Sequence, residues 1–158
     1  MISKQGWINL YKPKNITSFK AINFIKKKFL INKIGHSGTL DPMAEGVLPI
    51  AIGKATKLIP YIRNMSKEYE FTVTWGTQTT TDDAEGKILF ESNYLPKKKE
   101  IEKKIINYIG YINQIPPKVS AIKINGKRAY KLFRENKKFK IQPKKVFIED
   151  LCITDHSI

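Results

Sequence analysis

The chain opens with an alternation of apolar and polar residues and then changes to the three-to-four-residue spacing of a helix. Residues 6–13, GWINLYKP, alternate and end at a proline, which predicts a short strand running into a loop. Thr17 or Ser18 is predicted to cap a helix that continues to about Leu30. Lysines follow one side of this helix, and its expected buried face consists of Phe19, Ile22, Ile25 and Phe29.

Two further segments of the first half are predicted to be strands. VLPIAI (47–52) is almost entirely apolar and is bounded by Gly46 and Gly53, which is typical of a strand buried on both faces. EYEFTVTW (68–75) is rich in β-branched and aromatic residues and is the clearest strand prediction in the chain. Between them, residues 55–62 are predicted to form a short helix.

The second half is predicted to continue with mixed elements marked by glycine and proline. They are a loop at 76–86, a strand at 87–90, a helix opened by Pro96 and closed by Gly110, a hairpin-like turn ending 119–126, a helix at 128–136 and a strand at 145–153.

This succession of elements predicts an α+β (mixed α/β) fold on a mixed, mainly antiparallel sheet flanked by helices. No internal repeat or low-complexity linker interrupts the chain. We therefore expect one domain over residues 1–158, large enough to bury roughly two thirds of its unfolded surface around one core.

The charge adds a partner to this picture. Lys plus Arg number 29 against 14 Asp plus Glu, a net charge of +15, and the pI is about 9.8. A domain this basic attracts polyanions, of which nucleic acid is the commonest in a cytosol. AT-rich codon usage is an alternative source of part of the lysine excess, but the sign of the charge still favours RNA or DNA.

Composition also argues against several classes of chemistry. One cysteine, Cys152, cannot form an internal disulfide framework, which favours a reducing, cytoplasmic compartment. That cysteine and two histidines, His36 and His156, are too few for the usual zinc ligand sets, so we expect no metal. Neither a signal peptide nor a run of roughly 18 apolar residues is visible, so we expect no membrane association.

One stretch, GHSGTLDPMAEGVLPIAIGKATKL (35–58), has the character of an active site. Gly35, Gly38 and Pro42 indicate a shaped loop around Asp41, between a basic helix and a buried strand. An aspartate before a proline is also a common turn former, and on local sequence alone the two interpretations have about equal weight.

Two hydrolytic or phosphate-binding alternatives fit this stretch poorly. Ser37 lacks the glycine two residues later that a nucleophile elbow requires, since residue 39 is a threonine. The loop also lacks the Gly-Lys-Ser/Thr ending of a phosphate-binding loop.

The stretch 35–58 resembles the catalytic motif of the bacterial tRNA pseudouridine synthase B family, the tRNA pseudouridine-55 synthases. Other segments resemble the family's remaining motifs in the same order: NLYKPKNITS (9–18), KEYEFTVTWGTQTTTDDAEG (67–86) and IPPKVSAIKINGKRAYKLFRE (115–135). The resemblance covers nearly the whole chain. It implies a pseudouridine-synthase-like fold, a tRNA substrate recognised at the T-stem loop, and chemistry without a cofactor or metal.

The resemblance also assigns roles to single residues. Asp41 matches the catalytic aspartate, which detaches uracil from its ribose and lets it reattach through carbon, as a nucleophile or as a base. Tyr69 matches the tyrosine that stacks on the target base, although by itself it would be interpreted as a core aromatic. His36 matches the histidine that supports the flipped-out nucleotide.

Three more residues fall within the matching motifs and are expected to contact the substrate. Gly38 and Thr39 lie in the catalytic motif, and Lys12 lies in the lysine-proline motif, where it is expected to shape the floor of the site. From local sequence alone, an exposed lysine beside a loop proline is the alternative for Lys12.

Base flipping follows from the chemistry. A buried carboxylate cannot reach the glycosidic bond of a stacked base, so the nucleotide has to be extruded at a cost of a few kcal/mol. Lysines would then contact the RNA phosphates.

The family continues beyond the segment at 145–153 with a Gly-Thr-Tyr-Ile-Arg-type motif whose arginine pairs with the aspartate. Arg63, Arg128 and Arg134 lie in no such motif, so we expect a sheet that is incomplete at the C-terminus, no C-terminal RNA-binding domain, and a second polypeptide as one source of the arginine. Two alternatives stay open: a non-catalytic tRNA-binding protein or RNA chaperone that retains the fold, and a decayed, poorly folded fragment.

Overall fold

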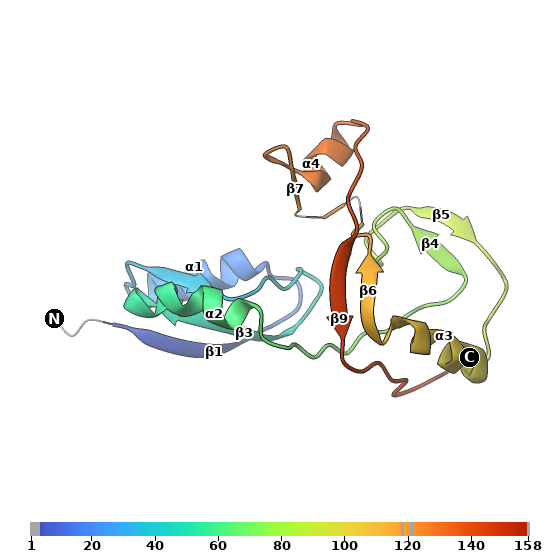
Figure 1. The fold of residues 1–158 in the computed structure, drawn as a ribbon. Coiled ribbons are helices and arrows are strands. Elements are labelled where there is room, and N and C mark those ends of the chain that lie inside the picture. The colour runs from blue at the N-terminus through green and yellow to red at the C-terminus, as the bar shows by residue number, and fades with distance from the viewer. Residues whose placement is uncertain (1–3, 118, 121, 158) are drawn as a thin grey trace. The chain divides into compact units, whose positions relative to one another are not determined.

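The computed structural model describes residues 4–117, 119–120 and 122–157, and the chain divides into two compact units, Met1–Glu70 and Phe71–Ile158. Figure 1 shows the fold and labels most of the helices and strands of both units. The single domain expected over 1–158 stays a prediction beside this division. Among the described helices, none has the length and apolar character needed to cross a membrane.

The first unit is built on a three-stranded antiparallel sheet with the order β1-β3-β2. Strand β1 (Gly6–Lys12) pairs along its whole length with β3 (Gly46–Ile52), and β2 (Ile34–His36) pairs with the last three residues of β3. The strands predicted at 6–13 and 47–52 are confirmed. The short β2 lies at the start of the stretch that was expected to be a loop.

Helix α1 (Ser18–Lys28) packs against one face of this sheet, and the first predicted helix is confirmed. The Thr17 side chain accepts a hydrogen bond from the Lys20 N–H at 3.1 Å and caps the helix. The core cluster consists of Ile22, Ile25, Ile31, Leu48, Ile50 and Ile52.

The buried face of α1 was predicted wrongly at both of its ends. Phe19 is 71% exposed and Phe29 46% exposed, whereas Ser18 and Ala21 are buried. The buried face of the helix therefore includes two small side chains, and both phenylalanines are left exposed to solvent.

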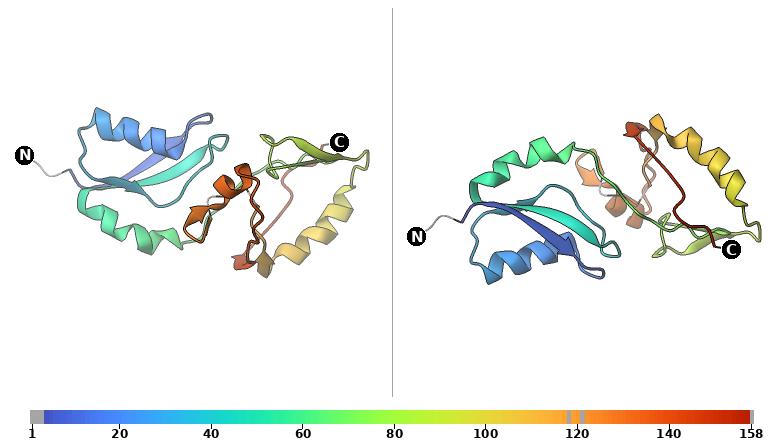
Figure 2. Two further views of the ribbon diagram at one scale, coloured as in Figure 1. Left: turned by 90° about the horizontal axis from the view of Figure 1, so that it is seen from above. Right: turned by 90° about the horizontal axis from the view of Figure 1, so that it is seen from below.

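A 3₁₀ helix η1 (Gly53–Leu58) and the short α2 (Ile59–Arg63) follow β3 and confirm the helix predicted at 55–62 in outline. Figure 2 shows α1 and the η1–α2 segment on opposite sides of the sheet. A Cβ on Gly35 would lie 2.8 Å from the Cδ1 atom of Ile59, so glycine at this position allows the second layer to approach.

The strand predicted at 68–75 is wrong, because residues 65–74 form no helix or strand. The alternation of side chains is present in the sequence, but Tyr69, Phe71 and Val73 are 65%, 66% and 50% exposed. A strand needs a hydrogen-bonding neighbour, and none of the described residues pairs with this segment.

The second unit contains several two-stranded pairings and short helices. Its elements are β4 (Thr77–Thr79), β5 (Ile88–Glu91), α3 (Lys98–Ile105), η2 (Ile106–Tyr108), β6 (Gly110–Gln114), β7 (Lys123–Ile124), β8 (Lys127–Arg128), α4 (Ala129–Arg134) and β9 (Lys144–Ile148). The pairs β4-β5, β6-β9 and β7-β8 are all antiparallel.

Most predictions for this unit hold in kind and differ in extent. The Asn125-Gly126 turn joins β7 to β8 with φ values of 47° and 82°, as a hairpin of this type requires, while residue 121 of the predicted segment lies outside the described residues. The loop expected at 76–86 contains β4, and the helix expected from Pro96 begins two residues later. The strand expected over 145–153 ends at Ile148, which pairs with Gly110, the first residue of its antiparallel partner β6.

Together these elements confirm the predicted fold class. The described residues form a mixed α/β structure of antiparallel sheets and helices.

The start of α3 gives a pH-dependent prediction. The Glu100 carboxylate accepts hydrogen bonds from the Lys97 N–H at 2.7 Å and from the Tyr94 hydroxyl at 2.8 Å, and the Lys97 bond is the main cause that lowers the pKa of Glu100. Since the folded pKa lies below the unfolded one, the carboxylate stabilises α3 fully above the unfolded pKa, and this contribution is lost as pH falls through the folded pKa.

We expect α3 amide protection, measured by hydrogen exchange between about pH 7 and pH 3, to fall at the acid end. Glu100→Gln keeps a neutral acceptor for the Lys97 N–H and should give weaker but pH-independent protection there. Glu102→Gln, in the same helix, serves as the control. Wild-type protection that is constant down to pH 3 would contradict the assignment.

Candidate active site

The loop from Ser37 to Glu45 joins β2 to β3 and carries the predicted catalytic motif. Ser37 is buried, and its N–H donates to the Pro49 carbonyl at 3.2 Å, so the loop begins fixed to β3. The other end runs directly into β3 at Gly46, which pairs with Lys12 of β1. Both ends of the loop are therefore held by the sheet.

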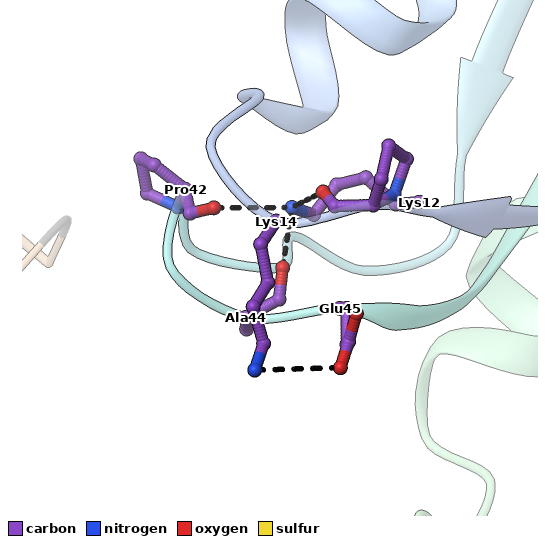
Figure 3. Close-up of polar contacts among 6 residues, drawn as sticks. Lys12, Lys14, Pro42, Ala44 and Glu45 are labelled. Carbon is purple, nitrogen blue, oxygen red and sulfur yellow. Dashed lines mark hydrogen bonds and ion pairs between the residues drawn. The ribbon is translucent and has the colours of Figure 1, made fainter.

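Lys12 lies inside the base of this loop. Its side chain is 0% exposed, and its ammonium donates to the carbonyls of Ile16 at 2.8 Å and Ala44 at 2.5 Å, with the Pro13 and Pro42 carbonyls at 3.0 Å and 3.5 Å. Figure 3 shows the ammonium between the loop after β1 and the loop before β3. One buried cation thus joins two segments about thirty residues apart in sequence.

The alternative interpretation of Lys12 as an exposed lysine beside a loop proline is wrong. The ammonium is surrounded by carbonyl oxygens in this arrangement, which gives Lys12 the role of holding the loop in shape. Direct contact between Lys12 and substrate stays a prediction.

Two more backbone anchors flank the aspartate. The Ser18 hydroxyl donates to the Leu40 carbonyl at 2.9 Å and accepts from the Leu40 N–H at 3.0 Å. The Asn15 N–H donates to the Pro42 carbonyl at 2.8 Å, with Asn15 in the left-handed region at φ 63°. The residues on both sides of Asp41 are consequently bonded to the start of α1 and to the connection between β1 and α1.

Asp41 itself is exposed, so the expectation of a buried carboxylate is wrong. Its carbonyl accepts a hydrogen bond from the Ala44 N–H at 3.1 Å, which closes a tight turn. Pro42 is the second residue of this turn, a position at which proline is favoured. The two interpretations of the Asp41-Pro42 pair, a turn and a shaped loop, are therefore compatible. The backbone is fixed while the carboxylate stays accessible to a large substrate.

A second carboxylate stands four residues later in the same loop. Glu45 forms an ion pair with Lys14, 3.5 Å between Nζ and Oε1, as Figure 3 shows. Its hydrogen bond to Tyr11 is the main cause that raises the pKa of the Tyr11 hydroxyl. Glu45 is therefore engaged with side chains of the β1 end.

Three other predicted residues lie in this loop or directly before it. His36, at the end of β2, is half-buried, and its Nδ1 forms a hydrogen bond with the Gly38 carbonyl. Gly38 is half-buried with open space where a Cβ would be, and Thr39 is exposed. His36, Gly38, Thr39 and Asp41 thus lie along one short segment, residues 36–41, at the end of β2 and the start of the loop. Their roles stay predictions.

Tyr69 is not part of this arrangement. It lies in the segment without helix or strand, and no hydrogen bond or ring contact among the described residues joins it to the loop. Its stacking role stays a prediction.

Sequence reasoning did not assign Ser18 and Asn15 to the site. Ser18 was considered as a helix cap, and Thr17 takes that role. The signal that could have found Ser18 is the pair of adjacent hydroxyl residues at the helix start, because one cap needs only one of them.

The arrangement offers an accessible carboxylate on a loop whose backbone is anchored on both sides of it, and a histidine at the end of β2 that precedes this loop. Within the residues that the structure describes, no group of three or more His, Cys, Asp or Glu side chains is placed to hold a metal ion. A fixed carboxylate of this kind can act as a nucleophile or as a general base on a substrate that reaches it.

Comparison with known proteins gives a family match over most of the chain. Residues 26–157 match the family described as TruB family pseudouridylate synthase (N terminal domain). A "tRNA pseudouridine synthase B" of Ehrlichia chaffeensis (strain ATCC CRL-10679 / Arkansas) is 55% identical over 129 residues, which are 82% of this chain and 44% of that protein. The chain spans about half the length of the first curated relatives it matches.

A shorter relative and a solved structure agree with this match. A Rickettsia prowazekii (strain Madrid E) protein, provisionally given the same name, is 48% identical over 145 residues, 92% of this chain and 84% of that protein. A chain in the crystal structure of a Cbf5-Nop10-Gar1 complex is similar with a TM-score of 0.51 and 28% identity, over 75% of this chain and 31% of that chain.

Proposed function

The chain belongs to the TruB family of pseudouridylate synthases, and on this premise we propose that it isomerises uridine to pseudouridine at position 55 in the T loop of tRNA. The observation that supports this most is the loop around Asp41, where Leu40 and Pro42 are both anchored and the carboxylate between them is exposed. Release of tritium from 5-tritiated uridine in a T-loop RNA tests the proposal.

The reaction exchanges one bond of the nucleoside for another. The bond between ribose C1′ and uracil N1 breaks, the uracil turns, and a bond forms between C1′ and C5. The hydrogen at C5 leaves as a proton, and N1 takes up a proton, so the atoms balance without an external oxidant or reductant. We propose that the Asp41 carboxylate assists the first step as a nucleophile or as a base.

The neighbouring residues position the substrate. In this proposal His36 supports the extruded nucleotide, Tyr69 stacks on the uracil, and Gly38 and Thr39 contact the nucleotide beside Asp41. Lys12 is placed with them as the residue that keeps the loop in shape. The exposed carboxylate is accessible to a base that is flipped out of the RNA, whereas a base stacked within the RNA would keep its glycosidic bond out of reach.

The RNA partner is supported by the charge distribution of the first unit. No aspartate or glutamate occurs before Asp41, and the exposed side of α1 carries Lys20, Lys27 and Lys28. Phe24 is 63% exposed between them, with the Lys28 Nζ 5.7 Å from the centre of its ring. Ammonium groups beside an exposed aromatic ring suit phosphates and an unpaired base.

Removal of these three ammonium groups should weaken RNA binding. For Lys20, Lys27 and Lys28 changed together to Gln, we expect about a ten- to thirtyfold lower affinity for a T-stem-loop RNA at about 0.1 M salt, measured by fluorescence anisotropy. The slope of log affinity against log salt should become shallower by about two to three.

The control is the same charge change on α3, with Lys98, Lys99 and Lys104 replaced by Gln. An equal loss for both triple variants would show that only net charge matters and would contradict a binding role for α1.

The proposal has two further parts: the source of an arginine that pairs with Asp41, and the cellular compartment in which the protein acts. We propose that a second polypeptide supplies the arginine. Addition of cell extract depleted of this chain to the purified chain should then raise the rate of tritium release. A rate unchanged by such extract contradicts this part. The free cysteine, Cys152, and the basic charge fit a cytoplasmic location.

A further inference from the structure

We infer that Ser18 is a positioning residue for Asp41. It fixes the peptide groups on both sides of Leu40 and thereby determines the direction in which the Asp41 side chain points away from the loop. This inference rests on the proposed function, in which Asp41 acts on the nucleotide.

Ser18 is joined to the loop by two hydrogen bonds, both to the backbone of Leu40. The Ser18 side chain is 2% exposed, and its hydroxyl donates to the Leu40 carbonyl at 2.9 Å while it accepts from the Leu40 N–H at 3.0 Å. One hydroxyl has one proton to donate and lone pairs to accept, so both bonds can exist together. The Leu40 carbonyl belongs to the peptide group that contains the Asp41 nitrogen, and that group is therefore held directly.

Ser18 is free to do this because its neighbour caps the helix. The Thr17 side chain accepts from the Lys20 N–H, which leaves the Ser18 hydroxyl available to the loop. Ser18 is the first residue of α1, which is anchored to the sheet through Ile22 and Ile25. The two hydrogen bonds of Ser18 therefore join the loop to α1, which is itself packed against the sheet.

The alternative is that Ser18 only satisfies buried polar groups and stabilises the fold. The two roles differ in what they change. A purely stabilising residue would alter the folded fraction, whereas a positioning residue alters the rate of the bound complex, because a shift of about 1 Å at a reacting group can cost about a hundredfold in rate.

The experiment compares Ser18→Ala with Thr17→Ala in the full chain. Both remove a hydroxyl at the start of α1, but only the first removes the bonds to Leu40. Tritium release from a T-stem-loop RNA is measured across RNA concentrations, well below the melting temperature of each variant found by circular dichroism. We expect kcat to fall about ten- to a hundredfold in Ser18→Ala with KM changed less than about threefold.

Thr17→Ala should keep kcat within about twofold of the wild type, and Ser18→Thr, which retains the hydroxyl, should recover part of the lost rate. The exchange of the Leu40 amide proton, followed by NMR, should accelerate in Ser18→Ala and not in Thr17→Ala. This readout does not depend on activity or on RNA.

The outcomes separate this inference from the proposed function. Equal kcat values in Ser18→Ala and Thr17→Ala, with an active wild type, would overturn the positioning role and leave the proposed function standing. Leu40 exchange that is unchanged in Ser18→Ala would also overturn it, even if that variant loses activity. Wild-type release no greater than that of an Asp41→Asn variant, both for the purified chain and with extract depleted of it, would overturn the proposed function, and the positioning role with it.

Discussion

Asp41→Asn should reduce tritium release from 5-tritiated uridine in a T-loop RNA to background, a loss of at least about a thousandfold. Asparagine keeps the size of the side chain but loses the negative charge and basicity that the proposed reaction needs. Because Asp41 is exposed and only its carbonyl takes part in the turn, the variant should fold normally and bind RNA within about threefold of the wild type.

The control for this prediction is the other carboxylate of the loop. Glu45→Gln removes one negative charge and the ion pair with Lys14, and we expect the tritium release to stay within about threefold. The assay is run with the purified chain and again with extract depleted of it.

If wild-type release equals that of Asp41→Asn in both conditions while RNA is still bound, the chain is a tRNA-binding protein or RNA chaperone rather than an enzyme. A cooperative melting transition would exclude the decayed, poorly folded fragment.

Lys12→Met should lower the free energy of unfolding by about 3 kcal/mol or more and the melting temperature by about 6 to 12 °C. Methionine fills a similar volume, but it leaves the carbonyls of Ile16 and Ala44 buried without the donor that now satisfies them. Denaturant unfolding followed by circular dichroism measures the change.

Lys14→Met is the matched control two residues away. Lys14 is exposed and pairs with Glu45 at 3.5 Å, so its loss should cost less than about 1 kcal/mol. Similar losses of stability in the two variants would contradict the role of Lys12 as the residue that joins the two loops.

Local pattern was sufficient where the physical cause was itself local. The alternation in β1, the apolar run of β3 and the hydroxyl residues at the start of α1 predicted their elements because periodicity and capping act within a few residues. The same reasoning failed at 68–75, where the β-branched and aromatic residues are present but no described strand pairs with them. A strand depends on a neighbour that its own sequence cannot supply.

The candidate site divides in the same way. The motif around Asp41 predicted which residues lie together, since they are consecutive in one loop. The burial of Lys12 could not be predicted, because it depends on carbonyls contributed by residues 42 and 44. The placement of Tyr69 beside this loop stays a prediction for the same reason.

The distribution of charge in the first unit also bears on how fast an RNA arrives. Asp41 and Glu45 are the acidic residues between positions 1 and 67, and Glu45 is paired with Lys14. An approaching polyanion therefore meets an attractive long-range field and a repulsive charge only at close range. Association should be electrostatically steered and slow as ionic strength rises, while the dissociation rate, set by close contacts, should change less.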